Sequence, residues 1–308
     1  MSAGMPITMS ARFIAYPPDR AALVRILGDG QIYRIGRART CELRIEHASV
    51  SRFHAELEGS ARGWHLRDTA SKNGVRIDGE AVTRGIIVKP TWLAVGDVYC
   101  WLEPISAAEA GLHRSEIEVR RATSRIMSEH LAQTRDIQSL IPQTLDVVLE
   151  LSGLERGFVV FAPPGEALRI HACRGLAAQE IASTRFSGSV AAVEHVLADG
   201  NSVICCDTLD SPWLGARPSV QMGGIRALLC VPLRQGDLSL GAIYADSRKP
   251  GPPITELDLE MVEHVAEGVA ASLAAARLHE DVNDLLRQAR DAGMEIPRWD
   301  ELRPSSGK

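Results

Sequence analysis

The sequence lacks long hydrophobic runs, and only 5% of its residues are aromatic. Its apolar runs are short, such as residues 227–233, whereas a membrane-spanning helix needs about 18 or more apolar residues in succession. Residues 1–12 lack a basic start followed by an apolar core, so we expect no signal peptide. These absences predict a cytoplasmic protein with no insertion into a membrane.

Paired cysteines and nucleotide-binding loops are also missing. None of the six cysteines belongs to a C-x-x-C pair, which argues against a zinc site or a disulfide framework. The chain has no G-x-x-x-x-G-K-[ST] phosphate loop, and no helix-turn-helix pattern follows residue 290. We find no kinase, ATPase, cyclase or DNA-binding element, and we expect no metal, no cofactor and no catalytic residue.

Charge is present but unevenly distributed. The chain has a net charge of −5, from 34 basic and 39 acidic residues. Residues 1–105 hold 14 Lys or Arg and 11 Asp or Glu, a net charge of +3, so the remainder carries −8. A surplus of three charges is too small for a nucleic-acid-binding surface but suits the binding of one small anionic group. We therefore expect no nucleic-acid partner.

The pattern of the chain changes near residue 105. Residues 12–104 contain eight or so short segments with period-two alternation, and Gly-Asp-Gly and Asp-Gly turns separate some of them. Short strands without a helical window predict an all-β sandwich or barrel. Residues 107–152 and 255–292 have helical patterns, and Thr255 with Asp258 is close to a capping box. Residues 153–250 mix strands with helical windows.

The chain is therefore predicted to be multidomain. An all-β domain would span residues 1–105, a connecting helix 106–132, and a second, α/β domain 133–277. Residues 278–308 would form a helical extension and a disordered tail.

Three motifs follow one another in the all-β region. Gly36-Arg37 comes first, then Ser51-Arg52-Phe53-His54, and finally Ser71-Lys72-Asn73-Gly74. In this order, over residues 12–104, they resemble a forkhead-associated (FHA) domain, a β-sandwich that binds phosphothreonine peptides. The resemblance implies that the partner is a threonine-phosphorylated protein.

The resemblance also implies a role for each residue in phosphopeptide binding. A phosphate offers three acceptor oxygens and requires charge-assisted donors. Arg37 would supply a guanidinium group, and Ser51 a hydroxyl group and its backbone N–H. Arg52 and Lys72 would add positive charge at the rim, and Asn73 would hold the backbone of an extended peptide.

Four further motif residues complete the predicted site. Ser71 belongs to the predicted phosphopeptide-binding set. His54 would be structural, because its ring would brace the loop that holds Ser51. Gly36 and Gly74 would permit tight turns. Taken alone, Arg37 would be interpreted as a surface arginine and Asn-Gly as a hairpin turn. Only the three motifs in this order indicate the site.

Residues 133–276 resemble a GAF domain. The resemblance rests on the sequences of residues 145–161, 186–207 and 224–248 and on the helix that follows. It implies a central antiparallel sheet with helices on one face and a small-molecule pocket on the other, so we expect a small ligand as a second partner. Five residues are predicted to line the pocket: Phe158, Cys206, Trp213, Arg226 and Tyr244.

The ligand itself is not predicted. The Asn-Lys…Phe…Asp-Glu signature of the cyclic-nucleotide-binding members is missing, so we expect no cyclic nucleotide. His171 or His195 could ligate haem in principle, but a lone histidine is usually packed or solvated. Cys205 and Cys206 are neighbours in a predicted strand and should point to opposite faces.

Three interpretations follow from these patterns. We favour a non-catalytic bacterial signalling adaptor, which docks a phosphorylated partner and senses a ligand or a state. A thiol-redox or sulfoxide-reducing enzyme and a structural assembly subunit with a vestigial pocket are the alternatives.

The 4-3-4 spacing of Leu278, Val282, Leu285 and Ala289 is typical of a short coiled-coil seam, which predicts a homodimer.

Overall fold

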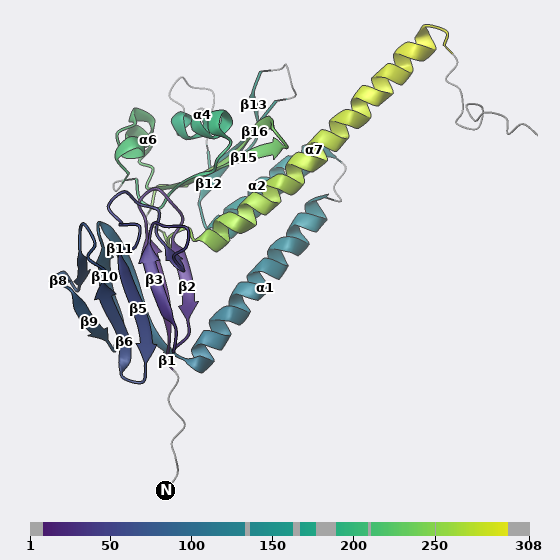
Figure 1. The fold of residues 1–308 in the computed structure, drawn as a ribbon. Coiled ribbons are helices and arrows are strands. Elements are labelled where there is room, and N and C mark those ends of the chain that lie inside the picture. Colours follow the sequence, from purple (N-terminus) through teal and green to yellow (C-terminus); the bar gives the residue numbers. More distant parts are fainter. Residues whose placement is uncertain are drawn as a thin grey trace, which may run out of the picture.

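The structure of the protein is a computed structural model. It describes residues 9–132, 136–162, 167–176, 189–208, 211–249 and 251–294. Figure 1 shows a β-sandwich followed by a long helix and an α/β domain, with a second long helix that projects beyond both. The predicted multidomain architecture, an all-β domain followed by an α/β domain, is confirmed.

The N-terminal domain is a sandwich of two sheets. Six strands form the first sheet in the order β2-β1-β11-β10-β7-β8, and five form the second in the order β4-β3-β5-β6-β9. The bounds of the strands are β1 Met9–Tyr16, β2 Leu23–Leu27, β3 Ile32–Gly36, β4 Leu43–Arg44, β5 Ala55–Ser60, β6 Gly63–Asp68, β7 Val75–Ile77, β8 Glu80–Val82, β9 Arg84–Ile87, β10 Thr91–Val95 and β11 Val98–Ser106.

The core of the sandwich lies between the two sheets. Alternate residues of each strand point inward, and Ala55, Leu57 and Gly59 of β5 are buried while their neighbours are less so. Phe13 of the first sheet and Trp64 of the second are fully buried in the same cluster. Burial of this apolar surface is the main force that holds the sheets together.

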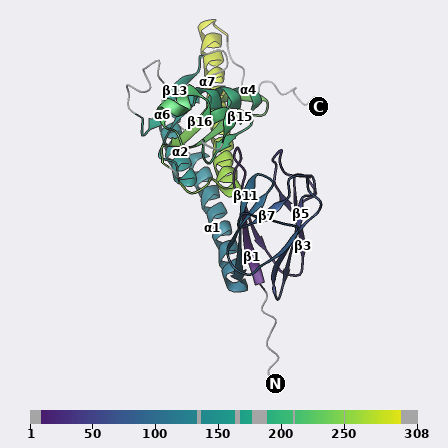
Figure 2. The same cartoon turned by 90° about the vertical axis from the view of Figure 1, so that its left-hand side faces the viewer.

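Helix α1 (Ala107–Ala132) begins at the residue after β11 ends. Ser106 and Glu109 form a reciprocal cap: the carboxylate of Glu109 accepts from the backbone N–H of Ser106 (2.7 Å), and the Ser106 hydroxyl accepts from the N–H of Glu109 (3.2 Å). The sandwich therefore continues into the helix without a loop. In Figure 2, α1 runs alongside the sandwich toward the C-terminal domain.

The C-terminal domain is built on an antiparallel sheet of five strands in the order β13-β12-β16-β15-β14. The strands are β12 (Arg156–Phe161), β13 (Arg169–Arg174), β14 (Val203–Cys205), β15 (Ala227–Gln235) and β16 (Leu238–Ser247). Strand β16 is central, with β12 and β15 on either side.

Helices cover both faces of this sheet. Residues of α1, α2 (Ile137–Ser152) and α7 (Glu256–Asp291) form one buried cluster with Val159, Ile204 and Ile243 of the sheet. On the opposite face, α4 (Val190–Asp199), α5 (Pro212–Gly215) and α6 (Pro218–Gly223) pack over a second cluster. The resemblance implied helices on one face only. The shorter helices α4, α5 and α6 on the other face were not expected. No helix in the described part of the chain is long and apolar enough to cross a membrane.

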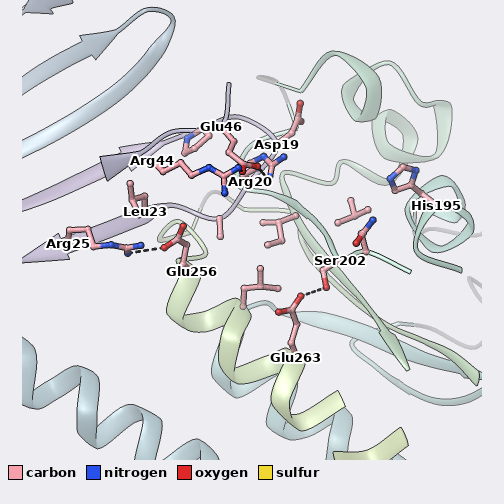
Figure 3. Close-up of a pocket in the computed structure, with 16 residues that line it drawn as sticks. Asp19, Arg20, Leu23, Arg25, Arg44, Glu46, His195, Ser202, Glu256 and Glu263 are labelled. Carbon is pink, nitrogen blue, oxygen red and sulfur yellow. Dashed lines mark hydrogen bonds and ion pairs between the residues drawn. The ribbon is translucent and has the colours of Figure 1, made fainter. Parts of the chain in front are cut away.

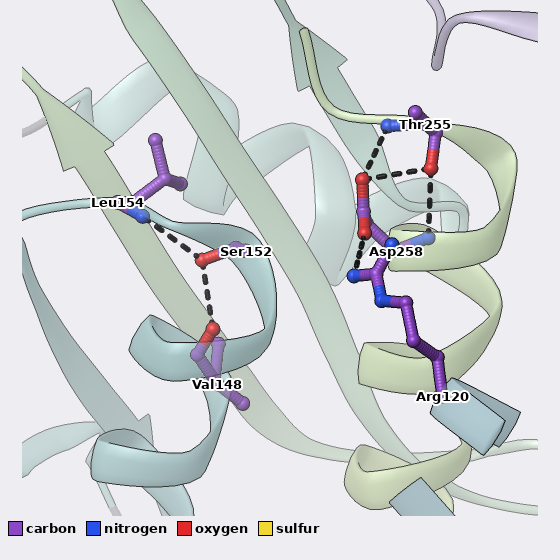
Figure 4. Close-up of polar contacts among 6 residues, drawn as sticks. All are labelled: Arg120, Val148, Ser152, Leu154, Thr255 and Asp258. Carbon is purple, nitrogen blue, oxygen red and sulfur yellow. Dashed lines mark hydrogen bonds and ion pairs between the residues drawn. The ribbon is translucent and has the colours of Figure 1, made fainter. Parts of the chain in front are cut away.

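The start of α7 is fixed by polar contacts (Figure 4). The Thr255 hydroxyl accepts from the N–H of Asp258, and the Asp258 carboxylate accepts from the N–H of Thr255 at 2.7 Å, which confirms the predicted capping box. Arg120 of α1 forms an ion pair with the same carboxylate at 2.5 Å. At the end of α2, the Ser152 hydroxyl donates to the carbonyl of Val148 at 2.7 Å. The start of α7 is thus tied to the middle of α1.

The loop between β1 and β2 joins the two domains. The N–H of Ala22 donates to the carbonyl of Ile254 (2.8 Å), and the N–H of Glu256 donates to the carbonyl of Ala22 (3.0 Å). Ala21 is 7% exposed and belongs to the core of the C-terminal domain. Arg25 of β2 pairs with Glu256 at 2.9 Å. The sandwich therefore contributes both a strand-like pairing and a core residue to the other domain.

Helix α7 runs without a break through residue 277, where the sequence analysis placed a domain boundary. Its last described turns, beyond Ala274, lie outside the buried clusters. The tail after residue 294, which the sequence predicts to be disordered, lies outside the described residues.

Candidate functional site

The three predicted motifs come together at Ser51. The backbone N–H of Arg37, in the β3–β4 loop, donates to the carbonyl of Ser51 at 3.0 Å. The backbone N–H of Lys72, in the β6–β7 loop, donates to the Ser51 hydroxyl oxygen at 3.0 Å. Three loops from distant parts of the sequence therefore meet at one residue, Ser51.

His54 lies beneath this point and is fully buried. Its Nδ1 accepts from the N–H of Ser51 at 3.0 Å, and its Nε2, which must then carry the proton, donates to the carbonyl of Gly74 at 3.0 Å. The ring thus connects the loop of Ser51 to the loop of Gly74, which fits the bracing role predicted for it. It also changes one expectation, because the Ser51 N–H that we assigned to the phosphate is already used by His54. The Ser51 hydroxyl, whose oxygen accepts from Lys72, keeps its own hydrogen for a ligand.

Three cations belong to the loops that meet at Ser51. Arg37, Arg52 and Lys72 are exposed, and within the described ranges none of their side chains has a hydrogen bond or an ion pair. Most other arginines of the sandwich are paired; Arg34, for example, contacts Glu42 at 2.7 Å and Arg12 contacts Glu103 at 2.6 Å. Cations without an internal partner can give charge-assisted hydrogen bonds to an anion.

Asn73 and Ser71 shape the third loop. The Asn73 side-chain amide donates to the carbonyl of Ser49 at 2.7 Å, so part of its hydrogen-bonding capacity is used to position the loop. The Ser71 hydroxyl accepts from the N–H of Gly74 at 3.0 Å, and the N–H of Ser71 donates to Asp68 at 3.1 Å. Ser71 therefore organises the turn. Among the described residues, the amide oxygen of the exposed Asn73 has no hydrogen-bond donor and can accept from a ligand.

The two motif glycines are needed for different reasons. Gly74 has a φ of +72°, a left-handed conformation that suits glycine, as predicted for a tight turn. Gly36 has no positive φ; a Cβ at this position would collide with the backbone carbonyl of Arg52. Gly36 is therefore needed so that two loops can approach closely, and not for the tight turn that was predicted. Val75, next to Gly74, is buried in the core.

Sequence reasoning missed Ser49. Its hydroxyl accepts from the backbone N–H of Asp97 at 2.8 Å and lies 2.8 Å from Nδ1 of His47. This contact ties the β4–β5 segment to the turn between β10 and β11. The two residues are 48 positions apart, and no local pattern marks them as neighbours.

The residues predicted to line a pocket in the second domain do not share one place. Phe158 and Tyr244 stack with their ring centroids 4.8 Å apart, and both are buried in the cluster beneath α4, α5 and α6. The N–H of Ser189 donates to the Tyr244 hydroxyl at 3.1 Å. Burial raises the pKa of Tyr244 well above its usual value.

Cys206 lies on the other side of the sheet, so its assignment to the same pocket is wrong. Its Sγ is 3.7 Å from the carbonyl of Ile254, next to the joint between the domains. Cys205 and Cys206 do point to opposite faces of the sheet, as predicted. Cys205, however, is the one that packs in the same cluster as Phe158 and Tyr244. Arg226 pairs with Asp207 at 2.5 Å.

The remaining candidates are dispersed. Trp213 lies in α5, and its side chain is outside the described residues. His171 of β13 is hydrogen-bonded to the carbonyl of Phe161 at 3.2 Å, and His195 of α4 pairs with Asp199 at 3.3 Å. In the segments that the structure describes, no group of three or more His, Cys, Asp or Glu side chains could hold a metal ion.

Three thiols of the second domain are poorly suited to redox chemistry. Burial raises the pKa of Cys205 to about 12 and also raises the pKa values of Cys206 and Cys230. The thiolate is the reactive form, and these environments disfavour it. The six cysteines are all free. These observations weigh against a thiol enzyme.

Comparisons with known proteins agree with this architecture. A family model of the FHA domain matches residues 33–101, and one of the GAF domain matches residues 136–273. The chain therefore contains an FHA domain followed by a GAF domain. Both are regulatory, non-catalytic domain families. A search of the curated proteins found no match.

Solved structures similar to the chain include both kinds of domain. The FHA domain of the CT664 protein from Chlamydia trachomatis is 22% identical, over 31% of this chain and 99% of that chain, with a TM-score of 0.28. The Slr1951 protein from Synechocystis sp. is 28% identical, over 32% of this chain and 97% of that chain, with a TM-score of 0.28. The GAF domain of cyanobacteriochrome TePixJ is 16% identical, over 48% of this chain and 95% of that chain, with a TM-score of 0.39.

Proposed function

We propose that the protein is a non-catalytic signalling adaptor whose FHA domain binds a threonine-phosphorylated partner. The observation that supports this proposal is that the loops meeting at Ser51 carry three exposed cations, Arg37, Arg52 and Lys72, whose side chains have no partner among the described residues. The phosphate would lie among them and accept from the Ser51 hydroxyl. Asn73 would bind the peptide backbone next to the phosphothreonine.

Titration of the full chain with phosphothreonine peptides, their phosphoserine counterparts and their unphosphorylated forms tests this proposal. Hydrogen bonds to charged groups contribute about 1.5–3 kcal/mol each, so Arg37→Ala or Ser51→Ala should weaken binding on the order of 10- to 100-fold. Arg84→Ala is the matched control, because Arg84 is an exposed arginine on β9, at the opposite edge of the same sheet from β4. A folded chain that binds no peptide pool in a phosphate-dependent manner would overturn the proposal.

We propose that the GAF domain senses a small ligand or a state and performs no reaction. Burial raises the pKa values of Cys205 and Cys206, which weighs against a catalytic role for these thiols. The free cysteines suit a reducing compartment, which supports a cytoplasmic location. Thermal-shift screening tests the ligand, since a compound at 100 times its dissociation constant adds about 2.7 kcal/mol of stability. A shift with a cyclic nucleotide would contradict the prediction made from the missing signature.

We also propose a homodimer. Leu278 and Leu285, on the part of α7 that extends past the sheet, are 65% and 64% exposed, and Val282 between them is 44% exposed. Apolar side chains at this spacing would be covered by the same helix of a second copy. The long helices of the two copies would then lie side by side.

A further inference from the structure

The outer face of the first FHA sheet carries a cluster of aromatic side chains. They stand on the neighbouring strands β1, β10 and β11 and point to the same side of the sheet: Tyr16, Trp92, Tyr99 and Trp101. Two of the five tryptophans and two of the four tyrosines of the chain therefore share one surface, which we call the aromatic face. Tyr99 is 66% exposed and Trp92 is 48% exposed.

The rings of the aromatic face form a continuous surface. The ring centroids of Tyr16 and Trp92 lie 5.8 Å apart, and those of Trp92 and Trp101 lie 5.0 Å apart. Tyr99 is the cross-strand neighbour of Tyr16. Cys100, between Tyr99 and Trp101 in the chain, is buried in the core, so the rings on either side of it point away from the core. Contiguous exposed apolar patches mark interaction sites, and tyrosine and tryptophan are enriched in such sites.

The aromatic face begins next to the phosphopeptide loops. In the turn between β10 and β11, the N–H of Gly96 donates to the carbonyl of Gly74 at 3.2 Å, and the N–H of Asp97 donates to the Ser49 hydroxyl at 2.8 Å. Tyr99 follows Asp97 by two residues, which span at most about 7 Å. A peptide bound between these loops can therefore reach the ring of Tyr99 within about five of its own residues.

The cleft between the two domains offers no comparable surface (Figure 3). It has a volume of about 1030 Å³, and its charged residues are of both signs. Arg25 pairs there with Glu256 at 2.9 Å, and Arg20 pairs with Glu46 at 2.7 Å. These pairs favour neither an anionic nor a cationic ligand. Of the two surfaces, the aromatic face has the better chemistry for binding a protein segment.

We propose that the aromatic face is a docking surface for the phosphorylated partner. The chain of the partner leaves the phosphopeptide loops on one side of the phosphothreonine and runs over the outer face of the first sheet. Within about five residues of the phosphothreonine it places an apolar side chain on the rings of Tyr99 and Trp92. The proposal rests on phosphothreonine binding by the FHA domain and adds that a second, apolar contact selects among phosphorylated partners.

The test uses the full chain and a set of labelled phosphothreonine peptides in which a single leucine is moved through eight positions on either side, with serine elsewhere. Fluorescence anisotropy measures each affinity. Leucine at one or two neighbouring positions on one side should tighten binding about three- to tenfold relative to the all-serine peptide, because it buries apolar surface against the rings. Leucine elsewhere should have no such effect.

Variants of the aromatic face locate the effect. Tyr99→Thr and Trp92→Thr keep a residue that suits a strand, and each should remove most of the gain from leucine. Tyr99→Phe retains the ring and should retain the gain. Ile86→Thr is the matched control, because Ile86 is 57% exposed on β9 of the other FHA sheet, and it should also retain the gain. Unchanged binding of the all-serine peptide shows that the phosphopeptide loops of each variant are folded.

The outcomes separate this proposal from the function on which it rests. Phosphate-dependent binding with no effect of leucine at any position would overturn the docking surface and leave the proposed function intact. A gain that persists in Tyr99→Thr and Trp92→Thr, or one that Ile86→Thr also removes, would overturn it as well.

Two further results bear on the proposal. If a second copy of the chain covered the aromatic face, Tyr99→Thr would shift the chain toward monomer in sedimentation and leucine would give no gain, which would also overturn the docking surface. Failure of every phosphothreonine peptide to bind the folded chain would overturn the proposed function, and the docking surface with it.

Discussion

Replacement of His54 by alanine should separate stability from binding. The imidazole is fully buried and accepts from the N–H of Ser51. Its removal leaves that N–H unpaired, while the carbonyl of Gly74 still accepts from the N–H of Gly96 at 3.2 Å. One unpaired buried donor costs about 1–3 kcal/mol. With the lost packing of the ring, we expect His54→Ala to lower the free energy of unfolding by about 2–4 kcal/mol.

Urea unfolding followed by tryptophan fluorescence measures this change, because Trp64, Trp92 and Trp101 all lie in the sandwich. Arg37→Ala is the comparison. It should leave the unfolding curve unchanged within about 0.5 kcal/mol, since its side chain is exposed. His54→Gln, which can accept and donate as the imidazole does, should recover part of the lost stability.

Peptide binding by the same variants completes the test. Below its unfolding transition, His54→Ala should bind a phosphothreonine peptide less tightly because the loop that carries Ser51 has lost its support. If His54→Ala abolished binding with no loss of stability, the ring would contact the ligand. The role of a buried brace would then be refuted.

Three further predictions concern the rest of the chain. Asp246→Ala leaves the buried Arg156 guanidinium without its carboxylate and should destabilise the GAF domain by about 3–5 kcal/mol in denaturant unfolding, whereas a loss below about 1 kcal/mol would contradict a buried pair. In the folded chain at pH 8, Cys205 should react with a thiol reagent on the order of 100-fold more slowly than after unfolding, because burial raises its pKa to about 12; rapid reaction would reopen the thiol-enzyme alternative. Glutamate at both Leu278 and Leu285 should shift the chain from dimer to monomer in sedimentation at tens of micromolar, and a monomeric wild-type chain would remove the dimer proposal.

The phosphopeptide motifs could be predicted from sequence because each is a short, local run of residues. Arg37, Ser51 and Lys72 were singled out together, and the structure joins their loops at Ser51 through backbone hydrogen bonds. The use of the Ser51 N–H by His54 could not be predicted, because it depends on the path of the loop. The contact between Ser49 and Asp97 was missed for the same reason.

Strands were predicted where alternation was clear. Eight or so strands are predicted for the sandwich, and the structure has eleven within residues 9–106. β10 shows no alternation in its sequence, because Trp92, Leu93, Ala94 and Val95 form a continuous apolar run, although Trp92 is 48% exposed. The pair Cys205-Cys206 shows a related limit: alternation predicts opposite faces but not which face each thiol takes.

The insertion of Ala21 into the GAF core restricts how the two domains can be exchanged during evolution. An alanine in a loop carries no sequence signal, yet it fills a position in the core of the neighbouring domain, and Ala22 pairs with the segment that leads into α7. A chimaera with a different FHA domain would lack this loop and leave the GAF core incomplete. The β11–α1 junction, which has no linker, adds a second constraint. The two domains should therefore have evolved as one unit, with changes in the β1–β2 loop matched by changes around Thr255.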